Sequence, residues 1–356
     1  MYLCLNRNFL SPVLFVLMIV VSPSSSAVIY TLKGNETVVG ELNTARAEFS
    51  DTLLDIGRIN GFGYQDLKLL NPDIDTWMPG EGQEIQLPGK FVLPSAPHKG
   101  IILNIPEMRL YYFPEKKAGE DQQVITYPLG VGREGWSTPY AKTTIVEKKK
   151  DPAWYPPESI RKEHAEKGDI LPKIVPPGPD NPLGAYAMRL GLGAYLIHGT
   201  NKPWGVGMRV SHGCIRLYPE HIEDLFNRVK VGTPVNIINQ PYKIGELDGV
   251  IYLEVHPHLD EDNEHFSQNS LTEVVKYIIE TTEQNRYKID WNLVKQVVAE
   301  SKGIPVAVGL HILELQASAE HSVNEVPEKP PVSEKKKHKE AGLQRVELQL
   351  DTDLGQ

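Results

Sequence analysis

The sequence predicts a mainly β protein, and three observations lead to this fold class. The 356 residues include 29 glycines and 28 prolines, together with many β-branched residues, which favours a turn-rich architecture. Short hydrophobic or alternating segments recur between residues 98 and 239. Hydrophobic residues at helical spacing are confined to short stretches. We therefore expect two or three small domains rather than a helical bundle.

The first 27 residues (1–27) predict a secretory signal peptide. Arg7 precedes a hydrophobic run at 12–21 that is too short to span a bilayer, and small residues lead up to Ala27. An uncleaved anchor is the alternative. Cleavage would remove Cys4 and leave a mature protein with one cysteine and no integral membrane segment. The formal net charge of −9 gives no indication of nucleic-acid binding.

Residues 43–90 predict a small α+β domain. Its expected elements are a strand at 45–49, helices at 52–60 and 64–70, and a strand at 84–87, with Asp51 as the first N-cap. This strand–helix–helix–strand (βααβ) order resembles the LysM domain in Asp51-Thr52-Leu53, Leu67, Asn71-Pro72, Gly82 and Ile85-Gln86-Leu87-Pro88. The resemblance implies peptidoglycan binding, and the alternative is a spacer domain that binds nothing strongly.

Residues 98–239 predict the β-rich domain. The expected strands are 100–105, 108–113, 124–131, 142–148, 184–188, 194–198 and 233–238, and the expected helix is 219–229. The first two strands flank a Pro106-Glu107 turn and predict a hairpin. Residues 151–182 are rich in proline and charge. A loop of this length in a compact domain commonly serves as a lid or a binding segment.

The chain beyond residue 245 differs in character. Residues 245–316 predict a partly helical extension with a strand at 250–255 and amphipathic helices at 271–282 and 289–301. This extension either docks a partner or simply packs against the protein. Residues 317–356 are charged and contain proline, which predicts a disordered tail. The lysine run within it is expected to be solvated, and contact with an anionic envelope polymer is the alternative.

Cys214 is the candidate nucleophile. A thiol attacks acyl groups as a thiolate and needs a base or a cationic neighbourhood, and His198, His212 and Arg216 are close to it in sequence. In an extended chain, His212, Cys214 and Arg216 would share one face. The backbone N–H groups of Gly213 and Cys214 are candidates for an oxyanion hole.

Two other interpretations of these residues compete with catalysis. A buried cysteine is usually inert, single histidines are usually structural, and arginines usually lie on solvated faces. A zinc site could use Cys214, His212 and His198, but no further cysteine or histidine has the spacing of a fourth ligand. We therefore expect no metal and no cofactor.

Residues 198–217 resemble the signature of the L,D-transpeptidases, the YkuD catalytic domain. The resemblance rests on His198-Gly199-Thr200 and Ser211-His212-Gly213-Cys214-Ile215-Arg216-Leu217. Further matching segments are Pro128-Leu129-Gly130-Val131-Gly132, Thr138-Pro139 and Val231-Gly232-Thr233-Pro234-Val235. The resemblance implies a β-sandwich-like catalytic domain. With the LysM-like unit in front, the chain is most similar to the periplasmic ErfK/YbiS/YcfS/YnhG branch.

The resemblance also implies a mechanism. Cys214 would attack the L-centre carbonyl of meso-diaminopimelate in a tetrapeptide stem of peptidoglycan, and His198 would carry the proton. His212 would position or polarise the pair and is the second candidate for the base. Arg216 would contact a stem carboxylate, and Ser211 and Gly213 would help to bind substrate. The acceptor would be a lysine of an outer-membrane lipoprotein; the alternatives are a second diaminopimelate (3→3 cross-linking), water (carboxypeptidase or hydrolase activity), or a non-catalytic wall-binding protein.

Overall fold

The computed structural model describes residues 27–34, 36–259, 270–282 and 287–312. The predicted signal peptide, except for Ala27, and the predicted tail at 317–356 lie outside these residues. Within the described ranges, no helix combines the length and the hydrophobicity needed to cross a membrane.

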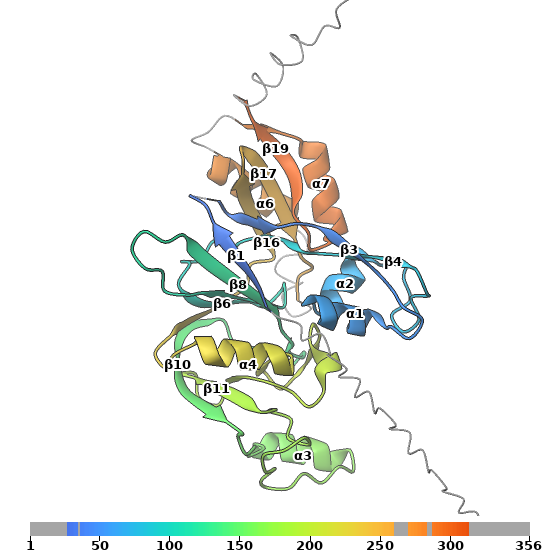
Figure 1. Cartoon of the computed structure of the whole chain (residues 1–356), viewed down its shortest axis with the longest axis vertical. Helices are drawn as coiled ribbons and strands as arrows, with labels where there is room; N and C mark the ends of the chain where they lie inside the picture. The colour runs from blue at the N-terminus through green and yellow to red at the C-terminus, as the bar shows by residue number, and fades with distance from the viewer. Residues whose placement is uncertain (1–26, 35, 260–269, 283–286, 313–356) are drawn as a thin grey trace, which may run out of the picture. The chain divides into compact units, whose positions relative to one another are not determined.

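A nine-stranded open sheet forms the centre of the fold and confirms the mainly β prediction (Figure 1). Its order is β1-β8-β7-β6-β15-β10-β11-β12-β14. The strands are β1 (Val28–Leu32), β6 (Gly100–Asn104), β7 (Arg109–Phe113), β8 (Gln122–Pro128), β10 (Ala141–Lys150), β11 (Tyr186–Leu190), β12 (Leu196–His198), β14 (Ile215–Arg216) and β15 (Pro234–Ile238). The predicted hairpin is β6 and β7, and β15 joins β6 in parallel.

The core of this sheet lies against the helix α4 (Pro219–Arg228) (Figure 1). Pro219 occupies the first helical turn, where its missing N–H costs nothing, and Ile222 and Leu225 are buried at helical spacing. The strand predicted at 124–131 is divided: β8 ends at Pro128, and β9 (Val131–Gly132) pairs instead with β13 (Arg209–Ser211). This second pairing leads into the cysteine motif.

The first unit has the predicted order of elements. β3 (Asn43–Arg46) pairs with β4 (Glu84–Leu87), and α1 (Leu53–Asn60) and α2 (Tyr64–Leu70) lie between them in sequence. The predicted N-cap was wrong by one residue. Thr52 caps α1 through a reciprocal box with Asp55, whereas the Asp51 carboxylate accepts from the Glu48 N–H at 2.9 Å.

Contacts between the first unit and the domain of the central sheet hold the two together. The Asp66 carboxylate accepts from the buried Arg109 guanidinium at 2.5 Å. The N–H groups of Tyr64 and Gln65 donate to carbonyls in the 206–207 segment at 3.3 and 3.2 Å. A Cβ at Gly207 would lie 2.2 Å from the Tyr64 nitrogen, so only glycine permits this approach.

The insertion at 151–182 contains a helix that the sequence analysis assigned to a loop. This helix, α3 (Glu158–Glu166), buries only Ile160, so it lacks the hydrophobic period that predicts a helix. Two backbone hydrogen bonds of 2.9 Å between Trp154 and Val175 close the base of the insertion. The segment is therefore an ordered insertion between two strands of the sheet, β10 and β11.

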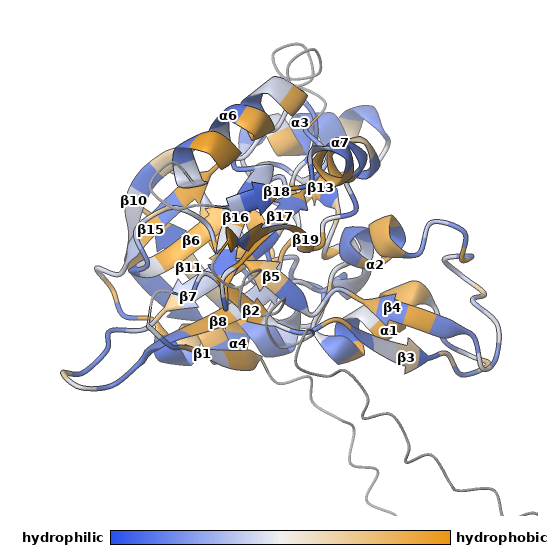
Figure 2. Ribbon diagram, turned by 90° about the horizontal axis from the view of Figure 1, so that it is seen from above, coloured by the Kyte–Doolittle hydropathy of each residue, from blue (hydrophilic) through white to orange (hydrophobic). Residues whose placement is uncertain are grey.

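The C-terminal region forms a separate four-stranded sheet, ordered β16-β17-β19-β18. Its elements are β16 (Tyr242–Leu247), β17 (Val250–Val255), α6 (Ser270–Thr282), β18 (Tyr287–Ile289), α7 (Trp291–Glu300) and β19 (Val306–His311). Both helices alternate between hydrophobic and polar residues in Figure 2, consistent with one buried face each. β16 begins before the predicted boundary at 245, and its Tyr242 and Ile244 enter the core of this region.

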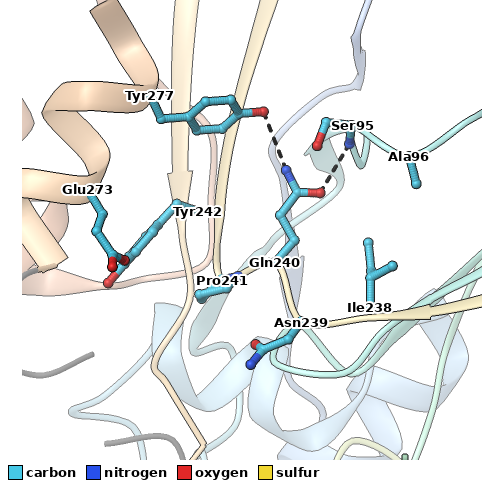
Figure 3. Close-up of a pocket in the computed structure, with 9 residues that line it drawn as sticks. All are labelled: Ser95, Ala96, Ile238, Asn239, Gln240, Pro241, Tyr242, Glu273 and Tyr277. Atoms are coloured by element: carbon cyan, nitrogen blue, oxygen red, sulfur yellow. Dashed lines mark hydrogen bonds between the residues drawn. The ribbon is translucent and has the colours of Figure 1, made fainter. Parts of the chain in front are cut away.

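Gln240 links this C-terminal sheet to the rest of the fold (Figure 3). Its side-chain oxygen accepts from the Ser95 N–H at 3.1 Å, and its nitrogen lies 3.5 Å from the Tyr277 hydroxyl on α6. A cavity of about 450 Å³ surrounds this bridge. Glu273 is the one ionisable carboxylate in its lining, and no lining residue is shared with the cavity at Cys214.

Candidate active site

Parallel pairing of two short strands brings the two halves of the motif together. β12 and β14 are neighbours in the sheet, with Ile197 opposite Ile215 and His198 opposite Arg216. The 15 residues between His198 and Cys214 therefore belong to the crossover between adjacent strands. His198 and Cys214 both line one cavity of about 460 Å³.

The cysteine lies in a bend rather than in the extended chain that was considered. Gly213 has a φ of +96°, and a Cβ there would lie 2.8 Å from the Tyr195 ring. The Ser211 hydroxyl donates to the Cys214 carbonyl at 2.5 Å and accepts from the Gly213 N–H at 3.1 Å. Thr138 donates to the Gly213 carbonyl at 2.9 Å. The bend is therefore held by side chains on two sides.

These contacts change the predicted roles of two residues. The Gly213 N–H is bonded to Ser211, which conflicts with its predicted place in an oxyanion hole. Ser211 lines the cavity, but its hydroxyl is engaged in holding the bend. His212 and Arg216 also line the cavity, whereas Gly213 does not.

His198 lines the same cavity as Cys214 and is the candidate general base. Its Nδ1 lies 2.6 Å from the Gly199 carbonyl oxygen, which can only accept, so Nδ1 carries the proton and Nε2 is left with a lone pair. Burial, reinforced by the Arg216 charge, lowers the pKa of His198 to about 3. The imidazole is therefore uncharged at neutral pH.

Cys214 is protonated in the same state. Burial raises the pKa of its thiol, while a hydrogen bond from the backbone of Leu196 and the Arg216 charge act in the opposite direction. The resting pair is thus a neutral thiol and a neutral imidazole. The proton has to move from sulfur to His198 as the sulfur attacks.

Arg216 supplies an unmatched positive charge. Burial lowers the pKa of its guanidinium, and it forms no ion pair with any carboxylate of the described ranges. Its Nε is buried without a hydrogen-bond partner. A carboxylate of a bound ligand would satisfy this group.

His212 has partners that the sequence analysis missed. Its Nε2 lies 3.1 Å from both the Glu163 carboxylate and the Arg133 guanidinium, and its ring meets Trp136 edge to face at 4.9 Å. Burial is the main cause of a lowered pKa of His212. No motif marks Glu163 or Arg133, because their meeting depends on how the insertion folds back.

The one metal-like cluster in the described ranges lies elsewhere, among Glu107, Glu254 and His256. Their potential ligand atoms lie within 4.8 Å of one another, but the Lys243 ammonium occupies the space between the carboxylates, at 2.8 and 2.7 Å. This cluster therefore contains its own cation.

A cysteine thiol, a neutral imidazole base and an unmatched arginine in one cavity define a site for nucleophilic acyl transfer. Comparison with known proteins identifies the family. The model of the L,D-transpeptidase catalytic domain (YkuD) matches residues 98–237. The chain belongs to this family and is an L,D-transpeptidase.

Three curated relatives align with this chain over similar lengths. "Probable L,D-transpeptidase YbiS" of Escherichia coli K12 is 39% identical over 246 residues, which are 68% of this chain and 79% of the relative. "Probable L,D-transpeptidase ErfK/SrfK" of Salmonella typhimurium is 39% identical over 70% and 79% of the two chains. "Probable L,D-transpeptidase YcfS" of E. coli K12 is 39% identical over 70% and 78%.

Proposed function

We propose that the enzyme acts on tetrapeptide stems of peptidoglycan and forms a thioester between Cys214 and the L-centre carbonyl of meso-diaminopimelate. One observation carries this proposal: Cys214, His198 and Arg216 line the same cavity. A stem peptide offers the carbonyl that the sulfur attacks and a carboxylate for Arg216.

Acylation begins from the neutral pair. His198 Nε2 takes the thiol proton as Sγ bonds to the carbonyl carbon, and the carbonyl electrons move onto oxygen. When the tetrahedral intermediate collapses, the bond to the D-alanine nitrogen breaks and His198 returns the proton to that amine. The products are free D-alanine and the Cys214 thioester.

Deacylation uses the same imidazole in the opposite direction. An acceptor amine attacks the thioester, His198 Nε2 takes its proton, and the sulfur leaves and is reprotonated. We favour a lysine amine of an outer-membrane lipoprotein as the acceptor, which the resemblance implies. A second diaminopimelate amine would give a 3→3 cross-link, and water would give hydrolysis.

A neighbouring cavity supports a separate approach for the acceptor. It measures about 390 Å³ and shares Tyr155, Leu183 and Arg189 with the catalytic cavity. Asp151 lines it, and a carboxylate attracts an incoming ammonium group; Glu147 and Lys149 line it too, but Glu147 is already paired with Arg189. Two neighbouring cavities with shared lining residues suit a reaction in which a donor leaves and an acceptor then enters.

We further propose that the enzyme works in the periplasm and that the first unit binds glycan. The signal-like segment at 1–27 supports export. Phe49 is 87% exposed beside a surface hollow of the first unit, and aromatic side chains commonly stack on sugar rings. Phe49→Ala should weaken retention on purified sacculi, whereas Cys214→Ala should not.

Product analysis tests the transfer reaction. Purified enzyme is incubated with disaccharide–tetrapeptide and a lysine-terminated acceptor peptide. Mass spectrometry then measures the masses of the protein and of the products. We expect an acyl adduct on Cys214, and Cys214→Ala should lower product formation at least about a thousandfold. An active Cys214→Ala variant would refute the mechanism.

The products then separate the acceptors. A diaminopimelate–lysine link supports lipoprotein anchoring, and a tripeptide–tetrapeptide dimer supports 3→3 cross-linking. Tripeptide alone supports hydrolysis. A folded enzyme with neither adduct nor product would indicate a wall-binding protein without catalysis.

A further inference from the structure

Glu163 connects the 151–182 insertion to the catalytic bend. It lies on α3, and its carboxylate accepts from Arg133 Nη2 at 2.6 Å and from the Lys167 ammonium at 2.7 Å. The same carboxylate lies 3.1 Å from His212 Nε2. Ile160, on the preceding turn of α3, lines the catalytic cavity. The helix and the catalytic motif therefore share one cluster of charges.

Two of these contacts require opposite states of His212. A carboxylate only accepts, so the bond to Glu163 needs a proton on Nε2. A guanidinium only donates, so a bond from Arg133 Nη2, also at 3.1 Å, needs a bare Nε2. Which ring nitrogen of His212 carries the proton therefore depends on whether Glu163 or Arg133 is hydrogen-bonded to Nε2.

Glu163 favours the first state. It binds Arg133 itself, which satisfies that donor and reduces its attraction for the His212 lone pair. The backbone of Arg133 is also fixed, because its N–H donates to the Ser211 carbonyl at 3.0 Å. Without the carboxylate, Arg133 loses the acceptor that competes with the His212 lone pair.

We propose that Glu163 is a positioning residue, which holds α3 against the catalytic cavity and keeps the His212 proton on Nε2. The consequence for catalysis rests on the proposed function, but the contact and the tautomer do not. Loss of the carboxylate moves the proton to Nδ1, reorients the ring beside Cys214 and loosens the wall of the cavity.

The test combines histidine ¹⁵N–¹H spectra of the full chain with the rate of Cys214 acylation by disaccharide–tetrapeptide. Glu163→Ala should move the His212 proton from Nε2 to Nδ1 and slow acylation about tenfold or more. Glu163→Gln keeps an acceptor oxygen and should retain the Nε2 proton and part of the rate. Glu166→Ala removes an exposed carboxylate from the same helix and should change neither.

Each result has a defined meaning. An unchanged tautomer in Glu163→Ala overturns the proposal, and so do equal effects of Glu163→Ala and Glu166→Ala. A tautomer shift in an enzyme whose wild type is never acylated supports the positioning contact and rejects the proposed function. Melting curves of all variants verify that each is folded.

Discussion

Two clusters of buried charge in this protein are built in opposite ways. In the junction cluster (Glu107, Lys243, Glu254, His256), every member has a charged partner within hydrogen-bonding distance. In the pocket cluster (His198, Cys214, Arg216), the imidazole and the thiol are neutral, and the arginine pairs with no carboxylate in the part of the chain that the structure describes. Removing one member of a buried set of paired charges leaves the others uncompensated and destabilises the fold, whereas a buried charge without partners is available to a ligand.

The locations of the clusters fit this difference. The junction cluster joins the turn before β7 to β16 and β17, and Lys243 also donates to the Val92 carbonyl and the Tyr111 hydroxyl. It thereby ties the C-terminal sheet to the central sheet. The pocket cluster opens into a cavity instead.

Lys243→Met should have the largest effect on stability. It leaves two buried carboxylates without their cation, which costs about 3–5 kcal/mol of unfolding free energy. Chemical denaturation at pH 7 measures this. Lys117→Met removes a pair that is 85% and 58% exposed and should cost at most about 0.5 kcal/mol. Equal costs for the two variants would contradict the distinction between the clusters.

Arg216→Gln should separate function from stability. Loss of a charged hydrogen bond to the substrate carboxylate lowers kcat/KM about 10- to 100-fold. The unfolding free energy should not fall, because the removed cation forms no ion pair among the described residues and its Nε is buried without a hydrogen-bond partner there. Arg228→Gln is the matched control, since Asp224 already neutralises that arginine at 2.8 Å and it lines neither cavity. A large loss of stability in Arg216→Gln would show that the pocket cluster also holds the fold.

Acid should act on the two clusters in different pH ranges. In the folded protein His198 stays neutral down to its pKa of about 3, whereas in the unfolded chain it takes up a proton near pH 6.5. The unfolding free energy therefore falls as the pH drops from 6.5 towards 3. Burial alone would raise the pKa of Glu107, but Lys243 and His256 outweigh it and lower the pKa to about 2. The contribution of Glu107 to the unfolding free energy is complete above pH 4.5 and is lost as the pH falls through about 2.

Denaturation curves between pH 7 and pH 2 test this order. His198→Gln should remove part of the loss of stability between pH 6.5 and 5, because His198, like His221, is kept neutral in the folded protein and takes up its proton in the unfolded chain. A variant that retains the wild-type slope over this range would assign the proton uptake to other groups.

Arg58→Met should have only a small effect. Arg58 binds Glu220 at 2.9 Å across the contact between the first unit and α4, but its side chain is 40% exposed. Solvent screening limits such a pair to about 0.2–1 kcal/mol. Thermal melting and the acylation rate should both stay close to wild type. A loss comparable with that of Lys243→Met would mean that the contact with α4 stabilises the protein as much as the junction cluster does.

Local sequence signals predicted many of the elements. Capping and turn residues located α2 and β4 at their observed bounds, and continuous hydrophobic runs located β17 and the β6–β7 hairpin. The cysteine motif identified residues that do share a cavity. These signals depend on neighbours within a few positions, so the sequence alone contains them.

The tertiary structure decided the rest. β1 and β19 are strands because of partners far along the chain, at β8 and at β17 and β18. Lys243 is buried because residues near 92, 107 and 254 converge on its ammonium. Glu163 meets His212 only because a polar helix without a hydrophobic period folds back onto the motif. The sequence therefore determined which residues can perform the chemistry, and long-range packing determined their charge states and their supports, because burial and electrostatic fields depend on distance in space rather than along the chain.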